Sequence, residues 1–145
     1  MKELHASIDI DAPPERVWAV LTDLGGFEDW NPFITHAAGG LSEGARLRIT
    51  IEPPGGRPMS FRPTVREVQP NQKIRWMGRF LVPGIFDGEH TLAIEPLGEG
   101  RVRFSQVERF SGALTMFSGK LFDRTQRGFE AMNEAVKRRS ESIEP

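Results

Sequence analysis

The stretch IDIDAPPERVWAVLTDL, residues 8–24, contains the change of pattern that decides the fold. Its first residues complete a run over 3–10 in which apolar and polar side chains alternate, as in a half-buried strand. Pro13 and Pro14 then suit the first turn of a helix, and apolar residues follow at helical spacing up to residue 24. The chain is therefore predicted to open with a strand followed directly by a helix over 13–24.

Beyond this helix, the pattern predicts one short helix over 27–30, then a series of strands, then a long helix over 118–140. The long helix is indicated by apolar residues that recur at steps of three and four. Turns rich in glycine and proline separate the strands. The expected strands after the first are 34–39, 45–52, 60–69, 72–80, 85–95 and 101–110.

The short turns between these strands favour antiparallel hairpins. We therefore predict an α+β fold of the helix-grip type, in which one seven-stranded antiparallel sheet curves around the long C-terminal helix. Two short helices would lie between the first and second strands. The length of 145 residues suits a single domain over 1–145, with residues 141–145 as a loose tail.

Four stretches carry a resemblance to a known family: residues 8–24, WNPF at 30–33, FDGEH at 86–90, and RGFEAMNEAVK at 127–137. Together they resemble the START/SRPBCC superfamily, in particular its polyketide cyclase/dehydrase-like branch. The resemblance covers residues 3–140 and implies the START-like fold. Members of the superfamily include carriers of hydrophobic ligands, aromatic polyketide cyclases, plant hormone-binding proteins and chaperone cofactors, so the resemblance implies no single activity.

The composition excludes several classes of function. The 19 basic and 20 acidic residues give a formal net charge of −1, so no nucleic-acid partner is expected. The absence of cysteine excludes disulfides, thiolate metal sites and a cysteine nucleophile. No apolar run approaches the roughly 20 residues that span a bilayer, and residues 1–11 lack the pattern of a signal peptide. We expect a cytoplasmic protein without a membrane span.

Metal and cofactor sites are not expected either. His5, His36 and His90 fall on separate elements without the spacing of metal ligands, and no phosphate-binding or dinucleotide-binding motif occurs. No feature indicates an oligomeric state.

The candidate site is a cavity of roughly 300–1,000 Å³ between the sheet and the long helix, the usual size of a small-molecule site. Its expected lining comes from residues on the inward faces of the strands, from the long helix and from the WNPF stretch. The candidate ligand-binding residues are Trp30, Trp76, Phe86, His90, Phe104, Gln106, Glu108, Phe110, Phe117, Phe122 and Phe129. The aromatic members could equally be ordinary core residues.

His90, Gln106 and Glu108 are the most informative of these residues because they interrupt apolar strand faces. The turn at 97–100 pairs their two strands, which sets His90 opposite Glu108 or Gln106. A buried charge requires a partner, so these groups could be a structural pair, contacts for a polar group of the ligand, or an acid–base pair. His90 and Glu108 are the only catalytic candidates.

Three functions remain open. The first is binding of a small hydrophobic molecule, lipid-like or aromatic, in the cavity. The second is an enzyme of the cyclase or dehydratase type, and the third is a protein-interaction module of the chaperone-cofactor type. The third would require an exposed apolar surface, whereas the outward faces carry many arginines with acids nearby, which favours an ordinary solvated surface. These arginines are Arg46, Arg48, Arg62, Arg66, Arg75, Arg79, Arg101 and Arg103.

Overall fold

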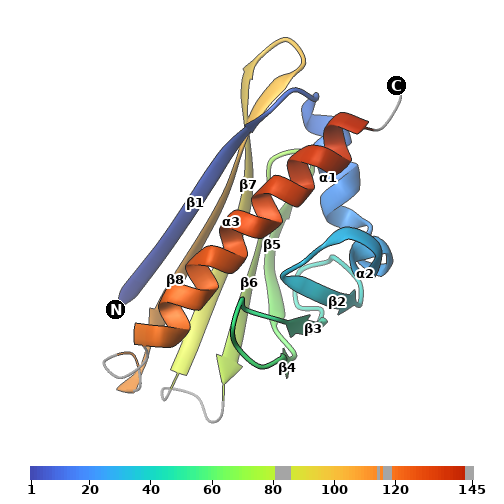
Figure 1. Ribbon diagram of the computed structural model, residues 1–145. Helices are drawn as coiled ribbons and strands as arrows, with labels where there is room; N and C mark the ends of the chain where they lie inside the picture. The colour runs from blue at the N-terminus through green and yellow to red at the C-terminus, as the bar shows by residue number, and fades with distance from the viewer. Residues whose placement is uncertain (81–85, 114, 116–118, 143–145) are drawn as a thin grey trace.

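The computed structural model of the chain describes residues 1–80, 86–113, 115 and 119–142 (Figure 1). It contains two antiparallel sheets, one long C-terminal helix and short helices near the N-terminus. In chain order the elements are β1 (Lys2–Ile10), α1 (Pro14–Thr22), a 3₁₀ turn (Leu24–Gly26), α2 (Phe27–Trp30), β2 (Ile34–Ala38), β3 (Arg48–Ile51), β4 (Met59–Phe61), β5 (Thr64–Gln69), β6 (Lys73–Phe80), β7 (Phe86–Gly98), β8 (Arg101–Ser111) and α3 (Gly119–Ser142).

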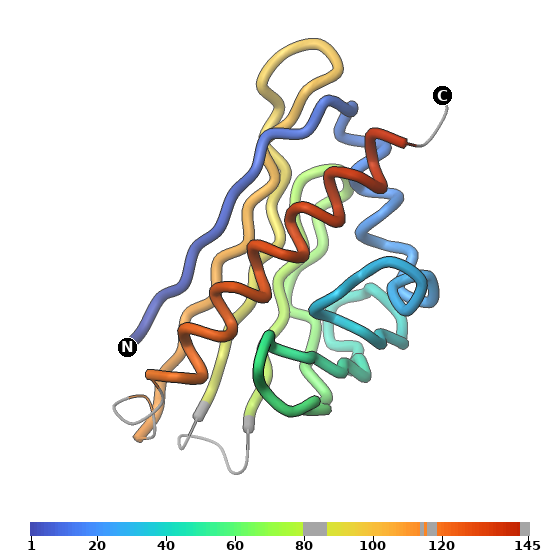
Figure 2. Tube along the Cα trace, in the orientation of Figure 1, coloured from blue at the N-terminus to red at the C-terminus, as the bar shows by residue number. Residues whose placement is uncertain are grey.

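The helix α3 lies obliquely across one face of a five-stranded sheet with the order β1-β8-β7-β6-β5 (Figures 1 and 2). A three-stranded sheet, β2-β3-β4, stands beside it together with α1 and α2. Every strand pair is antiparallel. The α+β helix-grip fold predicted from the sequence is therefore confirmed.

The strand count differs from the prediction: over the described residues, eight strands form two sheets where seven strands in one sheet were expected. The difference arises within the expected strand 60–69, which ends at Phe61 and resumes at Thr64. Pro63 lies between the two parts and has no N–H to donate to a ladder. The two parts still pair with one continuous segment, since Ile49 lies opposite Phe61 and a single bridge joins Arg46 to Thr64.

The apolar periodicity of α3 is confirmed by burial. Phe122, Thr125, Phe129, Met132 and Val136 are all buried along one side of the helix. This row packs against β1 and β8, so burial of the apolar stripe, rather than helix propensity, holds the helix in place.

Two helix boundaries differ from the prediction. The first helix ends at Thr22, and Leu24–Gly26 form a 3₁₀ turn before α2. The last helix continues to Ser142, so residues 141 and 142 are helical and not part of a tail. The carboxylate of Glu141 accepts hydrogen bonds from Lys137 and from the backbone N–H of Asp11, which fastens this end of the helix to the segment after β1.

The outer face of the large sheet carries ion pairs between neighbouring strands. Arg103 on β8 lies 2.8 Å from Asp9 on β1, and Arg109 lies 2.9 Å from Glu3. Arg75 on β6 reaches both Glu67 and Glu89. Arg101, near the turn, lies 3.1 Å from Asp11. These pairs offset the charge of five basic residues, Lys73 included, on a face that is open to solvent.

Candidate functional site

A cavity lies between α3 and the two sheets, at the end where α3 begins. Its wall is assembled from the WNPF stretch, the small sheet, the inward faces of β6, β7 and β8, and the first turns of α3. The lining residues are Phe33, Ile34, Ile49, Ile51, Met59, Phe61, Trp76, His90, Glu108, Phe110, Leu121 and Thr125. Most of these side chains are apolar, as is usual for a site that binds an apolar molecule.

The cavity is much smaller than predicted. Its free volume is about 20 Å³, where roughly 300–1,000 Å³ was expected from ordinary ligand sites. A water molecule needs at least roughly 10–15 Å³ of such volume, so this conformation has room for about one water. The expected volume is therefore wrong for this conformation, because the lining side chains fill most of the space between the helix and the sheets.

Two glycines on neighbouring strands let the side chains of Glu108 and Phe61 pack closely against the large sheet. Gly78 on β6 lies directly opposite Gly88 on β7. A Cβ added at Gly88 would lie 2.5 Å from Oε2 of Glu108, and one added at Gly78 would lie 3.1 Å from the ring of Phe61. Any larger residue at position 88 would displace the Glu108 carboxyl, so Gly88 fixes where this group can lie.

Phe33, from the WNPF stretch, is wedged between the small sheet and α3. The side-chain oxygen of Asn31 accepts hydrogen bonds from the backbone N–H groups of Phe33 and Ile34, both at 2.9 Å, and so fixes the turn that points this segment inward. The ring of Phe33 makes an edge contact with Phe129, at 5.5 Å between centroids. A Cβ at Gly128 would lie 2.2 Å from the Phe33 ring, so this helix position must be glycine for the ring to pack.

His90 and Glu108 form the polar part of the cavity wall. They lie directly opposite each other on β7 and β8, which confirms the predicted pairing of the two strands. Nδ1 of His90 lies 3.7 Å from Oε1 of Glu108, which is too long for a direct hydrogen bond. The His90 ring also contacts Trp76 on one side and Phe129 on the other, with centroids 5.2 and 5.0 Å away.

A buried polar chain continues from the far side of the His90 ring into α3. The amide nitrogen of Gln106 donates to Oδ1 of Asn133 at 2.7 Å and, more weakly, to the carbonyl of Phe129. The amide oxygen of Gln106 is then the acceptor for Nε2–H of His90, at 3.0 Å. A neutral His90 therefore carries its proton on Nε2, and its Nδ1 lone pair faces Glu108.

Burial shifts the pKa values of the pair in opposite directions. Removal from water lowers the pKa of His90 to about 4, although the hydrogen bond that His90 donates to Gln106 opposes this shift. The same removal from water raises the pKa of Glu108 to about 8. At neutral pH both groups are therefore uncharged, so their contact is one of a carboxylic acid with an imidazole and not an ion pair. Glu108 then holds a proton that it can donate into the cavity.

The predicted site residues fall into three groups. Trp76, His90, Glu108 and Phe110 line the cavity. Phe104, Gln106, Phe122 and Phe129 are buried behind this lining, where they support it. Trp30 is half-buried against the edge of the Phe27 ring and is not part of the lining. Phe117 and the side chain of Phe86 lie outside the described residues.

Eight lining residues were not named from the sequence. They come from the small sheet and its approach, and from one side of the first turns of α3. They are Phe33, Ile34, Ile49, Ile51, Met59, Phe61, Leu121 and Thr125. For some of them the sequence contains a signal of an inward position. Apolar and polar residues alternate over 47–51, and Leu121 and Thr125 are four positions apart, so they share one face of the helix. What the sequence did not show was that the small sheet folds over the end of α3.

No group of three or more potential ligands that could hold a metal ion occurs among the residues the structure describes. Within the same residues, no helix is long and apolar enough to cross a membrane. The lining offers an apolar enclosure, a carboxylic acid that can donate or return a proton, and the hydroxyl of Thr125. This arrangement suits binding of an apolar molecule with few polar groups and could support proton transfer to it.

Solved structures share this architecture at low sequence identity. A START superfamily protein from Mycobacterium smegmatis has a TM-score of 0.78 and 18% identity, covering 98% of this chain and 99% of that one. The Zhui aromatase/cyclase from a Streptomyces species has a TM-score of 0.79 and 17% identity, covering 97% of this chain and 93% of that one.

A third structure, norcoclaurine synthase from Thalictrum flavum, was solved as a point mutant in complex with a transition-state analogue. It has a TM-score of 0.73 and 14% identity, covering 96% of this chain and 93% of that one. At such identities the three likenesses establish the fold alone.

A family model described as polyketide cyclase / dehydrase and lipid transport matches residues 1–142. No curated protein matches the chain.

Proposed function

The chain belongs to the polyketide cyclase/dehydrase and lipid transport family, since the match covers residues 1–142, and from this premise we propose that it binds a small hydrophobic molecule in the cavity between α3 and the two sheets. The observation that carries the proposal is the composition of the lining. Nine of the twelve lining residues are apolar, and the three polar ones are His90, Glu108 and Thr125. Such a lining favours a ligand that is mostly apolar and carries one or two polar groups.

The ligand must open the cavity in order to enter, because the present free volume is about 20 Å³. Met59, Phe61 and Leu121 are the lining residues best placed to move. Their side chains are half-buried, whereas the aromatic wall formed by Trp76 and Phe110 is buried. Met59 and Phe61 lie on the three-residue strand β4, which pairs with β3. Displacement of β4 would therefore enlarge the cavity while leaving the large sheet intact.

The test is native mass spectrometry of the protein purified from its own host. A co-purified small molecule, released and identified after denaturation, would support the proposal. The matched variants are Thr125→Phe, which fills the cavity from α3, and Arg127→Phe, which adds the same ring to an exposed position of the same helix. We expect the bound molecule to be lost from Thr125→Phe and kept by Arg127→Phe. If both folded variants retained it equally, the molecule would bind elsewhere.

A second candidate function is favoured by the Glu108 carboxyl itself. A carboxylic acid with a pKa near 8 that lines an apolar cavity is poised to give up or take a proton near neutral pH. The lone pair on Nδ1 of His90 would accept a hydrogen bond from the protonated carboxyl after a small approach from the present 3.7 Å, but the low pKa of His90 means that the proton stays on Glu108 until the bound molecule takes it. On this hypothesis the protein is an enzyme of the cyclase or dehydratase type, and the bound molecule is its substrate.

A further inference from the structure

The outer face of the small sheet carries two arginines that lie directly opposite each other. The register places Ile49 opposite Phe61, and the bridge on the other side joins Arg46 to Thr64. Between these two pairs, Arg48 faces Arg62 on neighbouring segments. Like charges in this arrangement repel each other.

Neither of these arginines is neutralised by an acid. Among the residues that the structure describes, no carboxylate lies within 4.0 Å of the guanidinium of Arg48 or Arg62. The large sheet differs, because its Arg75 and Arg103 each lie within 3.3 Å of a carboxylate. Arg66 is exposed and, within the same described part of the chain, also has no carboxylate within 4.0 Å, but it lies outside the depression described next.

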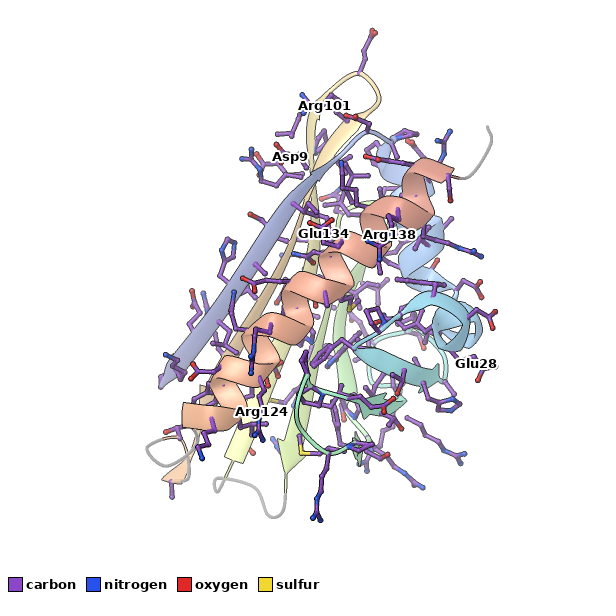
Figure 3. The ribbon with its side chains drawn as sticks, viewed as in Figure 1. Asp9, Glu28, Arg101, Arg124, Glu134 and Arg138 are labelled. Atoms are coloured by element: carbon purple, nitrogen blue, oxygen red, sulfur yellow. The ribbon has the colours of Figure 1, made fainter. Side chains whose placement is uncertain are left out.

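The two arginines border a depression of about 270 Å³ in the outer face of the sheet. Its surface includes the hydroxyls of Thr50 and Ser60, which lie 2.9 Å apart as a cross-strand pair. One of the two hydroxyl hydrogens lies between these oxygens, so the hydrogen of the other hydroxyl is free to be donated outward. His36 also borders the depression, with its Nδ1 3.9 Å from Glu28, the exposed acid labelled at the edge of the small sheet in Figure 3.

We propose that this depression binds a phosphate group, held between Arg48 and Arg62 with a hydroxyl of the Thr50–Ser60 pair as a further donor. Two guanidinium groups match the charge of a phosphate monoester, which is about −1.5 to −2 near neutral pH. Each guanidinium can donate two parallel N–H groups to a pair of the phosphate's terminal oxygens. A bound phosphate would also remove the repulsion between the two arginines.

The site is distinct from the cavity, although the two share a wall. Ile49 and Phe61 line both the depression and the cavity, whereas Arg48 and Arg62 line only the depression. The phosphate could therefore belong to a free phosphorylated molecule or to the headgroup of an anionic lipid at a membrane surface. The site would recognise the phosphate group in the same way in both cases, and the two tests below distinguish between them.

The first test is a titration of the protein with inorganic phosphate and with phenyl phosphate at low salt, followed by amide and arginine side-chain NMR signals. We expect saturable shifts at Arg48, Thr50, Ser60 and Arg62. Arg48→Gln and Arg62→Gln should each weaken binding by about tenfold or more, as for the loss of a charge-assisted contact. Arg138→Gln makes the same change of charge at an exposed helix position and should leave the affinity unchanged.

The second test uses vesicles of phosphatidylcholine with and without phosphatidic acid, whose headgroup is a phosphate monoester. Sedimentation with phosphatidic acid that is lost in Arg48→Gln but not in Arg138→Gln would identify a lipid headgroup as the source. Binding of phenyl phosphate without sedimentation would identify a soluble ligand. If neither probe bound, or if Arg138→Gln weakened binding as much as Arg48→Gln, the proposal would be overturned. Circular dichroism confirms that each variant is folded.

Discussion

At the scale of single residues, Glu108 and His90 couple protonation to stability. Between the ordinary pKa of a glutamate, 4.5, and the folded value of about 8, the folded protein keeps a proton that the unfolded chain releases. Stability from this group therefore falls as the pH rises. His90 acts in the opposite sense between about 4 and 6.5, where the unfolded chain binds the proton. The two effects oppose each other up to pH 6.5, and above it only the effect of Glu108 remains.

We therefore predict that the free energy of unfolding falls by roughly 1 kcal/mol between pH 6.5 and pH 8. Glu108→Gln cannot ionise and should remove this fall. Urea denaturation across this pH range measures the effect. Glu99→Gln, in the exposed turn between β7 and β8, is the matched control and should behave as the wild type does. An unchanged slope in Glu108→Gln would mean that the Glu108 carboxyl ionises normally in the folded protein.

The same substitution tests the catalytic hypothesis. If the protein turns over a substrate, Glu108→Gln should slow turnover by roughly 10²-fold or more, because the amide keeps the shape of the side chain but cannot donate an acidic proton. The rate should fall without a matching change in substrate affinity, which steady-state kinetics separates. Unchanged turnover would leave Glu108 with a structural role only.

The sequence predicted that His90 lies opposite Glu108 or Gln106, because alternation assigns all three to inward faces and a short turn pairs their strands; the structure shows that the partner is Glu108. It did not predict the role of Gln106, whose amide ties His90 to Asn133 on α3. That contact spans 27 residues and depends on how the helix lies across the sheet. Strand alternation carries no information about such a crossing.

At the scale of elements, the close approach between α3 and the WNPF stretch depends on a single glycine. Gly128→Ala should destabilise the protein by about 1–3 kcal/mol, because the new methyl group would overlap the buried ring of Phe33. This loss should exceed the helix-propensity gain of about 1 kcal/mol that alanine brings. Urea denaturation of Gly128→Ala and of the wild type measures this difference in the free energy of unfolding.

Gly119→Ala is the matched control, since nothing lies within 4 Å of a Cβ at the start of the same helix. It should leave stability unchanged or raise it slightly. Adding Phe33→Leu to Gly128→Ala should recover part of the loss, because the smaller side chain leaves space for the methyl group. A Gly128→Ala protein as stable as the wild type would show that the Phe33 ring can move away without cost.

Elements were predicted well where periodicity is long and less well where a proline interrupts a strand. The apolar row from Phe122 to Val136 is unambiguous, and α3 follows it closely. In the run 60–69, Pro63 allows the chain to continue in the same direction but breaks the hydrogen-bond ladder. The pattern of side chains is the same on both sides of the break, so the division into two sheets could not be inferred from it.

At the scale of the whole molecule, the large sheet and the small sheet should respond differently to a ligand. We predict that adding the co-purified molecule back to the emptied protein slows hydrogen exchange in β3, β4 and the first turns of α3, which close the cavity. Exchange in β1 should not change, because β1 contributes no residue to the lining. Exchange mass spectrometry resolves these segments. Uniform protection of both sheets would instead indicate global stabilisation without a local opening step.

The fold as a whole was predictable because the order of elements and the motifs at 8–24 and 30–33 occur together. The closed state of the cavity was not. Whether side chains fill the space between sheet and helix depends on packing among Phe33, Phe61 and Leu121, which come from three separate parts of the chain. Their contacts follow from the tertiary structure and not from any local pattern.

The position of Trp76 has a practical consequence. Its indole is buried in the cavity wall with its centroid 5.2 Å from the ring of His90, while Trp18 and Trp30 are half-buried and lie outside the lining. The chain contains no tyrosine. Replacing Trp18 and Trp30 by phenylalanine would leave one intrinsic fluorophore, placed where a ligand would arrive. Its emission would then report both occupancy and the charge of the neighbouring imidazole, without any attached dye.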